Sequence, residues 1–427
     1  MLLTVLLVTM LVLLLARVPV AIALLIPSLG YMLVTADFPV GAVAQRVTLG
    51  INNFILLAVP MFVLMGMLAN ASGITERLYA FAQSLLGHIR GSLGYVNVFV
   101  SMVFSWMSGI ATADAAGLSK IEVPAMRRAG YPFGFSAGIS AASSIIGPIM
   151  PPSVPAVIYA LAAGVSLGAM LLAGILPALT ITLFLCAYVA VWARRRPHLK
   201  QTRATRGQVI NATRSAALTL LTPVILLGGI LGGVVTPTEA AGLAVLYVLL
   251  LGVIHRTLSL RKVWDSLIQT GEMTSSVLLI VASAQLFAFV LSLEQVPATI
   301  ANFVLSLTES TYVFLLLVNI TLLLMGMFLE LASVIVIMVP VLLPVAIEFG
   351  IDPIQFGVIV VFNLMIGGLT PPIGLLIFVV SAALREPPGK VTRGVLPFLI
   401  PLLLALLVIT TVPALSMWLP QLAGLGT

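Results

Sequence analysis

Long uninterrupted apolar segments constrain the fold of this chain more than any other feature. Charge-free runs extend over Val47 to Thr75, Ala129 to Ala193, Ser215 to Thr238, Met273 to Leu293, Pro353 to Leu384 and Gly394 to Thr427. A helix needs about 20 apolar residues to cross the hydrocarbon core of a bilayer. The runs therefore predict roughly ten or more crossings, counting partial ones, and hence an all-α polytopic membrane protein.

The composition excludes several other classes of protein. With 61% hydrophobic and 8% charged residues, the chain has too little polar surface for a soluble fold. The first sixteen residues lack a basic start and a cleavage site, so they predict a retained membrane helix. The single cysteine, Cys186, excludes a disulfide framework, and the three histidines show no metal-ligand spacing, so no transition metal is expected.

Basic residues predict the orientation of the chain in the membrane. The net charge is +7, but the positive side chains lie in short connectors rather than on one face, which argues against nucleic acid as a partner. Residues 194–214 contain seven lysines and arginines and no acid, so the positive-inside rule places this connector in the cytoplasm. The connector divides the chain into halves, 1–193 and 215–427.

Matching glycines and prolines indicate that the two halves are repeats. Pro124, Gly130, Gly147 and Pro151-Pro152 recur 220 residues later as Pro344, Gly350, Gly367 and Pro371-Pro372. Two consecutive prolines interrupt a helix, since each lacks a backbone donor and clashes with the preceding turn. The chain therefore has a broken helix near 135–163 and another near 355–384, followed by a C-terminal helix. Isolated helix kinks are the alternative interpretation.

A second interruption precedes each broken helix. The span from Gly91 to Met126 is 36 residues long, which is too long for one crossing and too short for two. It predicts a re-entrant hairpin near 91–126, and the same reasoning predicts a second hairpin near 313–346. Paired broken helices in two inverted repeats are the best sequence indication of a transporter's binding site at the membrane midplane.

Three of the thirteen acidic residues are expected deep in apolar sequence: Asp114, Glu239 and Glu330. Hydroxyls, carboxylates and unwound backbone carbonyls are the hard ligands that a small cation prefers, and sodium is the natural candidate. Asp114 and Glu330 could instead cap helices, and Glu239 follows a proline as at a helix start. Asn363 could contact substrate or bond a neighbouring helix.

At these residues the chain resembles the DctM-like large membrane subunit of tripartite ATP-independent periplasmic (TRAP) transporters. The resemblance is carried by four segments: Ala113 to Gly130, Ser144 to Tyr159, Val235 to Gly242 and Gly326 to Gly374. It implies an elevator-type secondary transporter of the bacterial inner membrane, not an enzyme. It also implies Na⁺ as coupling ion, no other cofactor, and an organic acid as substrate. The implied partners are membrane lipid, a small four-helix membrane subunit and a periplasmic substrate-binding protein.

The resemblance also implies site residues. The first sodium site would be formed by Ser108, Gly109, Thr112, Asp114, Gly147, Pro148, Pro151 and Pro152. The second would be formed by Gly326, Glu330, Gly367, Gly368, Thr370 and Pro371. The expected substrate contacts are Ser108, Thr112, Ser143, Ser153, Asn363 and Pro372. Two positions depart from the family pattern, since Ile110 replaces a serine and Leu293 replaces an arginine of many members.

Three other functions are compatible with parts of the sequence. A stand-alone sodium-coupled dicarboxylate symporter would share the repeat but need no binding protein. An intramembrane hydrolase could use Ser108 and Asp114, but no histidine or lysine lies near Ser108 in sequence to activate it. A non-catalytic assembly subunit is the third. Two short amphipathic segments, Ile74 to Arg90 and Leu258 to Glu272, follow membrane spans in both halves and predict interfacial helices that brace the scaffold. Anchoring to the lipid surface alone is the alternative.

Overall fold

The computed structural model describes residues 2–16, 18–35, 40–196 and 199–425, so residues 197 and 198 of the basic connector lie outside it. Within the described residues all regular secondary structure is helical. Eight of the described helices are long and apolar enough to cross a membrane. The predicted all-α polytopic fold is confirmed.

Two similar series of helices follow each other along the chain. The first comprises α1 (Leu2–Leu15), α2 (Val20–Thr35), α3 (Val40–Ile51), the 3-10 helix η1 (Phe54–Leu57), α4 (Ala58–Ala71), α5 (Ile74–Leu86), α6 (Ser92–Ser108), α7 (Ala111–Arg128), α8 (Phe133–Ser143), η2 (Ser144–Ile146), α9 (Val154–Ala163), α10 (Leu167–Ala173) and α11 (Ile175–Ala193). The second comprises α12 (Arg206–Leu231), α13 (Pro237–Ile254), α14 (Leu260–Leu293), α15 (Val296–Leu307), α16 (Thr311–Phe328), α17 (Leu331–Glu348), α18 (Pro353–Gly367), α19 (Leu375–Leu384), α20 (Pro388–Thr411) and α21 (Ala414–Leu422).

The offset of 220 residues relates most helices of one series to a helix of the other. It carries α7 onto α17 with identical bounds, and it superimposes α6 on α16, α8 on α18, and α9 on α19 to within a few residues. The basic connector is partly helical, because α12 begins at Arg206, where Thr205 and Gln208 form a capping box.

Each half contains a helical hairpin with a very short turn. The first hairpin, α6 and α7, turns at Gly109 and Ile110, and the second, α16 and α17, turns at Leu329 and Glu330. Gly109 adopts a left-handed conformation with φ of 62°. A Cβ atom at this position would collide with the carbonyl oxygen of Pro152. Glycine therefore allows both the turn and its close approach to the neighbouring chain.

Each half also contains a helix interrupted at its proline pair. Between η2 and α9 the backbone is irregular from Gly147 to Ser153, and between α18 and α19 it is irregular from Gly368 to Gly374. The peptide bond between the two prolines is cis in both breaks. We call these segments break 1 (Gly147 to Ser153) and break 2 (Gly368 to Gly374).

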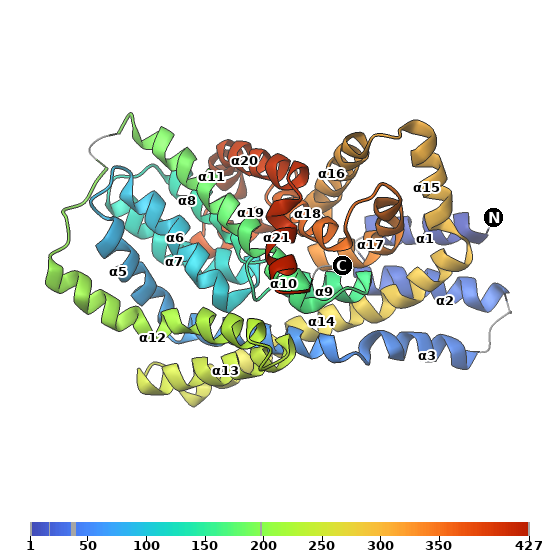
Figure 1. Ribbon diagram of the computed structural model, residues 1–427, viewed down its shortest axis with the longest axis horizontal. Helices are drawn as coiled ribbons and strands as arrows, with labels where there is room; N and C mark the ends of the chain where they lie inside the picture. Colours follow the sequence, from blue (N-terminus) through green and yellow to red (C-terminus); the bar gives the residue numbers. More distant parts are fainter. Residues whose placement is uncertain (1, 17, 36–39, 197–198, 426–427) are drawn as a thin grey trace.

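The hairpins and broken helices of the two halves pack reciprocally. The second arm of hairpin 1, α7, lies against α19, while the second arm of hairpin 2, α17, lies against α9. Helix α20 packs along α8, where Gly138 and Gly394 allow the two backbones to approach closely. Such close packing between small residues is typical of membrane helices. These elements form one unit, which occupies the middle and upper part of Figure 1.

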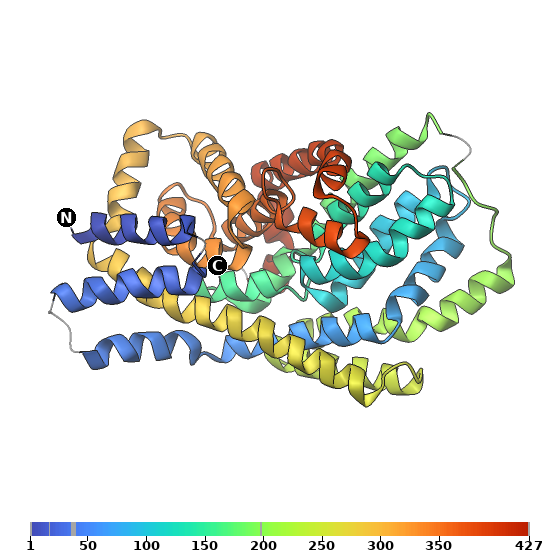
Figure 2. The same cartoon turned by 180° about the vertical axis from the view of Figure 1, so that it is seen from behind.

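Helices α2, α3, α4, α13 and α14 form a long framework beside this unit. Helices α3, α13 and α14 run along one long side of the molecule in both views (Figures 1 and 2). The repeat is visible here too, since α2 packs on α14 and α13 packs on α4. Contacts of α4 with α6 and of α14 with α17 connect this framework to the hairpins.

The two predicted interfacial segments have different structures. Residues from Ile74 form the separate amphipathic helix α5, which buries Leu78 and Ala82 against its neighbours. The segment from Leu258 to Glu272 is not a separate helix, because α14 continues without interruption from Leu260 to Leu293. The prediction of a short interfacial helix at this second segment was therefore wrong. The counterpart of α5 at the 220-residue offset is α15.

Candidate functional site

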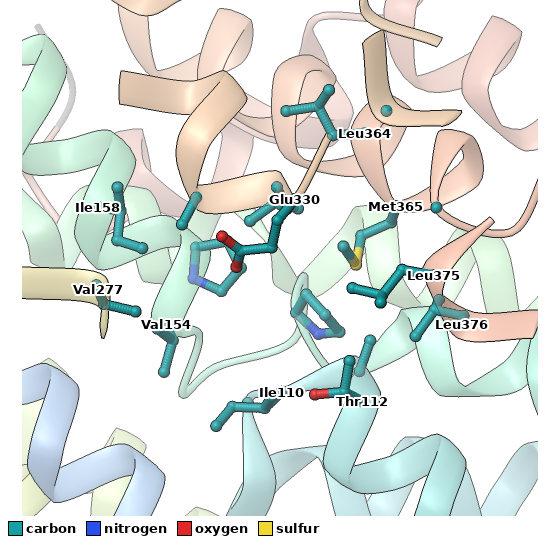
Figure 3. A pocket seen from close by; sticks show the side chains of 18 of the residues that line it. Ile110, Thr112, Val154, Ile158, Val277, Glu330, Leu364, Met365, Leu375 and Leu376 are labelled. Carbon is teal, nitrogen blue, oxygen red and sulfur yellow. The ribbon is translucent and has the colours of Figure 1, made fainter. Parts of the chain in front are cut away.

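Both hairpin tips and both breaks meet at a central cavity of about 120 Å³. It is lined by Val63, Gly109, Ile110, Ala111, Thr112, Pro148, Val154, Pro155, Ile158, Met273, Val277, Gly326, Leu329, Glu330, Leu331, Ala332, Leu364, Met365, Gly368, Leu375 and Leu376. Among these residues only Thr112 and Glu330 have polar side chains. Figure 3 shows that they enter the pocket from opposite sides, between apolar side chains that include Val154 and Leu375.

Four helices begin at the central cavity. The first residues of α7, α9, α17 and α19 all contribute to its lining. The first turn of a helix has unpaired backbone N–H groups and carries a partial positive charge, which stabilises a nearby anion. These four helix starts therefore place partial positive charge at the cavity, whose lining contains no lysine, arginine or histidine.

Asp114 connects the tip of hairpin 1 to break 1. Its side chain is fully buried and accepts a short hydrogen bond from the hydroxyl of Ser108 through Oδ1. Its second oxygen, Oδ2, has no hydrogen-bond partner among the described residues. A Cβ atom at Gly147 would collide with Oδ2, so this free oxygen lies directly against the backbone of break 1. Ser108, Asp114 and Gly147 are thus brought together as predicted.

Break 1 is held by its own hydrogen bonds. Ser153 caps α9 by accepting from the backbone N–H of Ala156 at 3.0 Å, and its hydroxyl donates to the carbonyl of Pro148. The backbone N–H of Val154 donates to the carbonyl of Gly109 at 3.4 Å. Of the predicted residues in this segment, Pro148 lines the central cavity and Gly147, Pro151, Pro152 and Ser153 do not.

Hairpin 2 meets the end of α18, next to break 2, through a glycine contact. A Cβ atom at Gly367 would lie 2.8 Å from Cα of Gly326, so the two backbones touch. The backbone N–H of Gly374 donates to the carbonyl of Met327 at 3.3 Å, which repeats the tip-to-break bond of the first half. Glu330 is at the N-cap position of α17, where Ser333 donates to its carboxylate at 3.4 Å.

The residues predicted for the second sodium site differ in position. Gly326, Gly368 and Glu330 line the central cavity, whereas Gly367, Thr370, Pro371 and Pro372 do not. The hydroxyl of Thr370 donates to the carbonyl of Ile366 at 2.7 Å and so satisfies the end of α18.

Neither acid at the hairpin tips is paired with a basic side chain. In the part of the chain that the structure describes, the one ion pair joins Lys390 and Glu386, at 2.9 Å on the surface. If ionised, Asp114 and Glu330 would carry negative charge into protein surroundings without a cationic partner among the described residues. Such a charge is costly in a membrane protein and requires compensation.

Two predicted substrate contacts lie away from the central cavity. Ser143 donates to Oδ1 of Asn97 at 2.9 Å, and Asn363 donates to Oδ1 of Asn319 at 2.6 Å. Ser143 and Asn363 are related by the 220-residue offset, so this polar contact between hairpin and broken helix is repeated in both halves. For Asn363, the structure favours the interpretation as a bond between helices.

The buried acids differ from those expected. Glu239 is exposed rather than buried, and Glu122, which sequence reasoning missed, is fully buried on α7. Glu239 forms a capping box at the start of α13, because it accepts from the backbone N–H of Thr236 at 2.8 Å. This confirms the helix-start interpretation of Glu239.

We expect Glu239→Gln to leave uptake and its sodium dependence unchanged, since glutamine also completes a capping box. Glu239→Ala should lower the thermal unfolding temperature, because it leaves the N–H of Thr236 unpaired. Initial uptake rates and melting curves of the purified protein measure both effects. A large change in sodium affinity with Glu239→Gln would show that this acid has a role beyond the cap.

The departures from the family pattern lie in different places. Ile110 lines the central cavity at the tip of hairpin 1, so an apolar side chain occupies this part of the wall. Leu293 ends α14 and does not line the cavity. The framework contributes Val63 from α4 and Met273 and Val277 from α14, which sequence reasoning also missed.

A second, open cavity of about 710 Å³ adjoins the first, and we call it the vestibule. It shares Thr112 and Met273 with the central cavity and is otherwise lined by α4, α5, α7 and α14. Its wall is more polar and includes Asn70, Glu76, Lys120, Lys262, Asp265 and Gln269. Lys262 follows the connector at His255 to Arg261, which is basic and therefore predicted to be cytoplasmic.

Comparison with known proteins gives consistent matches over nearly the whole chain. Residues 7–415 match the family described as "Tripartite ATP-independent periplasmic transporter, DctM component". The chain is 44% identical over 411 residues to the sialic acid TRAP transporter large permease protein SiaM of Vibrio cholerae, covering 96% of each chain. It is 37% identical to the C4-dicarboxylate TRAP transporter large permease protein DctM of Pseudomonas aeruginosa, covering 88% of each.

A further relative and a solved structure extend the comparison. The sialic acid TRAP transporter permease protein SiaT of Haemophilus influenzae is 38% identical, and the match covers 95% of this chain but 66% of SiaT. The crystal structure of the Alcanivorax borkumensis YdaH transporter has a TM-score of 0.64, covering 90% of this chain and 89% of that one. At 16% identity, this likeness shows a shared fold alone.

Proposed function

Because this chain belongs to the DctM family of tripartite ATP-independent periplasmic transporters, we propose that it carries an organic acid into the cell, driven by a sodium gradient. It is a multi-pass protein of the bacterial inner membrane and a transporter permease rather than an enzyme. The hydrolase alternative is thereby excluded.

One observation carries the sodium proposal. Asp114 and Glu330 each occupy a hairpin tip beside a break, without a basic partner, and Asp114 Oδ2 accepts no hydrogen bond from the described residues. Sodium would neutralise these carboxylates, and the backbone carbonyls of two breaks could complete its oxygen shell. Sites of this kind at the junction of two repeats couple ion binding to the closure of the repeats around a substrate.

The substrate proposal rests on the helix N-termini and on the relatives. The acidic molecules named in the relatives' titles are sialic acid, C4-dicarboxylate, isethionate and 2,3-diketo-L-gulonate. The central cavity offers an acid the N-termini of four helices, and bound sodium would add positive charge beside it. We propose a carboxylate or similar anion, delivered by a periplasmic binding protein to a complex with a small membrane subunit.

The arrangement of the vestibule suggests how the substrate leaves. The vestibule opens beside Lys262, on the side predicted to be cytoplasmic, and meets the central cavity at Thr112 and Met273. We propose that the hairpin unit is in its inward-facing position here. An elevator movement of this unit against α4 and α14 would then expose the central cavity to the periplasm.

Replacing sodium by potassium tests the proposed coupling. We expect uptake by the reconstituted complex, with binding protein and an inward Na⁺ gradient, to fall to background in potassium buffer. Ligand screening of the binding protein identifies the acid to use. Equal uptake in potassium would contradict sodium coupling, and full uptake without the binding protein would favour the stand-alone symporter.

A further inference from the structure

Glu122 is a buried carboxyl group that the proposed transport site does not use. It lies on α7, two helical turns beyond Asp114, and its side chain is fully buried. It does not line the central cavity or the vestibule. No lysine, arginine or histidine of the described chain forms an ion pair with it.

The neighbours of Glu122 form a polar cluster between three helices. Asn97 on α6 donates from Nδ2 to Oε2 of Glu122, and Ser140 on α8 donates to the same oxygen at 3.3 Å. Asn97 Nδ2 also donates to Ser140 Oγ at 2.7 Å. Ser143 and Ser101 extend the cluster, with a Ser101 to Ser143 bond of 2.8 Å. All these side chains are at most 1% exposed.

The hydrogen bonds leave one oxygen of Glu122 free. Oε1 is buried and has no partner in the described part of the chain. An ionised carboxylate in this position would carry an uncompensated charge between three packed helices, at a cost of several kcal/mol. A proton on Oε1 removes the charge. Asn97 turns its amide nitrogen, a donor, toward the carboxyl group, which suits a proton better than a cation that needs several oxygens.

The vestibule extends along α7 as far as the residues next to Glu122. Lys120 and Ile121, the residues before it, line the vestibule, as does Thr75 on α5. Tyr79 lies one turn beyond Thr75, and its buried hydroxyl has no hydrogen-bond partner among the described residues.

Few other charged groups face this position. Asp114 interacts electrostatically with Glu122 from the same helix, and Tyr79 does so from α5. Arg128 and Tyr131 are in turn within electrostatic range of Tyr79. Helices α4, α8 and α19, which also contact α7, contain no titratable side chain, and α6 contains only Tyr95, which faces Cys186.

We propose that Glu122 is a proton-binding site, at which the carboxylate takes one proton from vestibule water and hairpin 1 becomes competent for transport. Loss of this proton at high pH places a charge between α6, α7 and α8 and stops the transport cycle. The transport half of this proposal rests on the proposed function, whereas the protonation half does not.

Infrared spectroscopy of the purified complex in lipid nanodiscs tests the protonation directly. We expect the spectrum of the native protein minus that of Glu122→Gln at pH 7 to show a carboxylic-acid C=O band. This band should disappear as the pH is raised. A carboxylate band at pH 7 instead would overturn the proposal and favour a bound cation.

Ser140→Ala supplies a second test that keeps the carboxyl group. Removing one donor to Oε2 should shift the C=O band to higher wavenumber, while a purely structural serine would leave it unmoved. If the complex with Glu122→Gln does not assemble, Ser140→Ala still tests whether Glu122 is protonated. An unmoved band in a folded Ser140→Ala complex would assign the band to another acid and overturn the proposal.

Uptake at saturating sodium tests the transport half. Above the midpoint of the infrared titration, native uptake should fall by about tenfold per pH unit, as the protonated fraction does. Glu122→Gln cannot lose this proton, so its uptake should be independent of pH over the same range. Identical pH profiles would overturn the link to transport. If both proteins show sodium-dependent uptake at pH 7 but identical pH profiles, only the link between Glu122 and transport fails, and the proposed function stands.

Discussion

Asp114→Asn is expected to lower sodium-driven uptake by about a hundredfold, equivalent to about 3 kcal/mol. Asparagine has nearly the shape of aspartate and can still accept from Ser108, but it lacks the charge that a cation beside Gly147 requires. Removing one member of a buried charge pair commonly costs 3–5 kcal/mol. Initial uptake rates over a range of sodium concentrations measure the effect.

Glu239→Gln is the matched control for this experiment, because it removes one negative charge from an exposed helix start. Native sodium dependence and rate in Asp114→Asn would contradict the sodium site, and Asp114 would then act only at the start of α7. Size-exclusion profiles of both variants show whether the complex remains assembled, and a normal profile restricts the loss to ion coupling. Loss of uptake in an assembled complex would also argue against the alternative that this chain is a non-catalytic assembly subunit.

Gly367→Ala is expected to reduce uptake at least about tenfold by separating hairpin 2 from the end of α18. The new Cβ atom would lie 2.8 Å from Cα of Gly326 and 2.9 Å from the carbonyl oxygen of Leu323. Both contacts are to backbone, which cannot turn away as a side chain can, so the hairpin tip must shift. Overpacking of this kind typically costs about 1–3 kcal/mol. Uptake and thermal unfolding of the complex provide the measurements.

Gly242→Ala in α13 is a suitable comparison, since a Cβ atom there meets nothing within 4 Å. Alanine favours a helix over glycine, so this control should be neutral or slightly stabilising. Equal uptake by the two variants would mean that contact between Gly326 and Gly367 is not needed for transport.

The architecture could be predicted from the sequence where chemistry leaves few choices. Consecutive prolines must interrupt a helix, and an apolar segment of intermediate length must turn back, so the breaks and hairpin tips were recognisable from Pro151-Pro152, Pro371-Pro372 and Gly91 to Met126. The repeat reinforced both predictions, because the same signals recur 220 residues later.

The environment of each acid was harder to predict, because it depends on which face of a helix is covered. Glu239 follows apolar sequence yet caps an exposed helix start, and Glu122 lies among charged residues yet is buried. A helical pattern was available for Glu122, since α7 buries Asp114, Ala115, Leu118, Ser119, Glu122, Val123 and Met126 at intervals of three and four. The local sequence around Glu122 is rich in charge, but burial follows the face of the helix and not the local composition.

Contacts between helices distant in sequence could not be predicted at all. No local pattern indicates that Asn363 reaches Asn319, or that Met273 and Val277 of the framework complete the central cavity. These contacts result from how whole helices pack, and single-sequence patterns specify the faces of helices but not their neighbours.

The unbroken course of α14 couples the membrane surface to the bilayer interior. At 34 residues it is about 51 Å long, well beyond the hydrocarbon thickness of about 30 Å. Its charged beginning and its apolar end therefore belong to one continuous helix. Near the beginning of α14, the side chain of Lys262 donates to the backbone carbonyls of Thr257 and Ala71, at 2.8 and 3.1 Å. These bonds hold the charged end of the helix against its neighbours. The same helix therefore links this end to the central cavity, which Met273 and Val277 line.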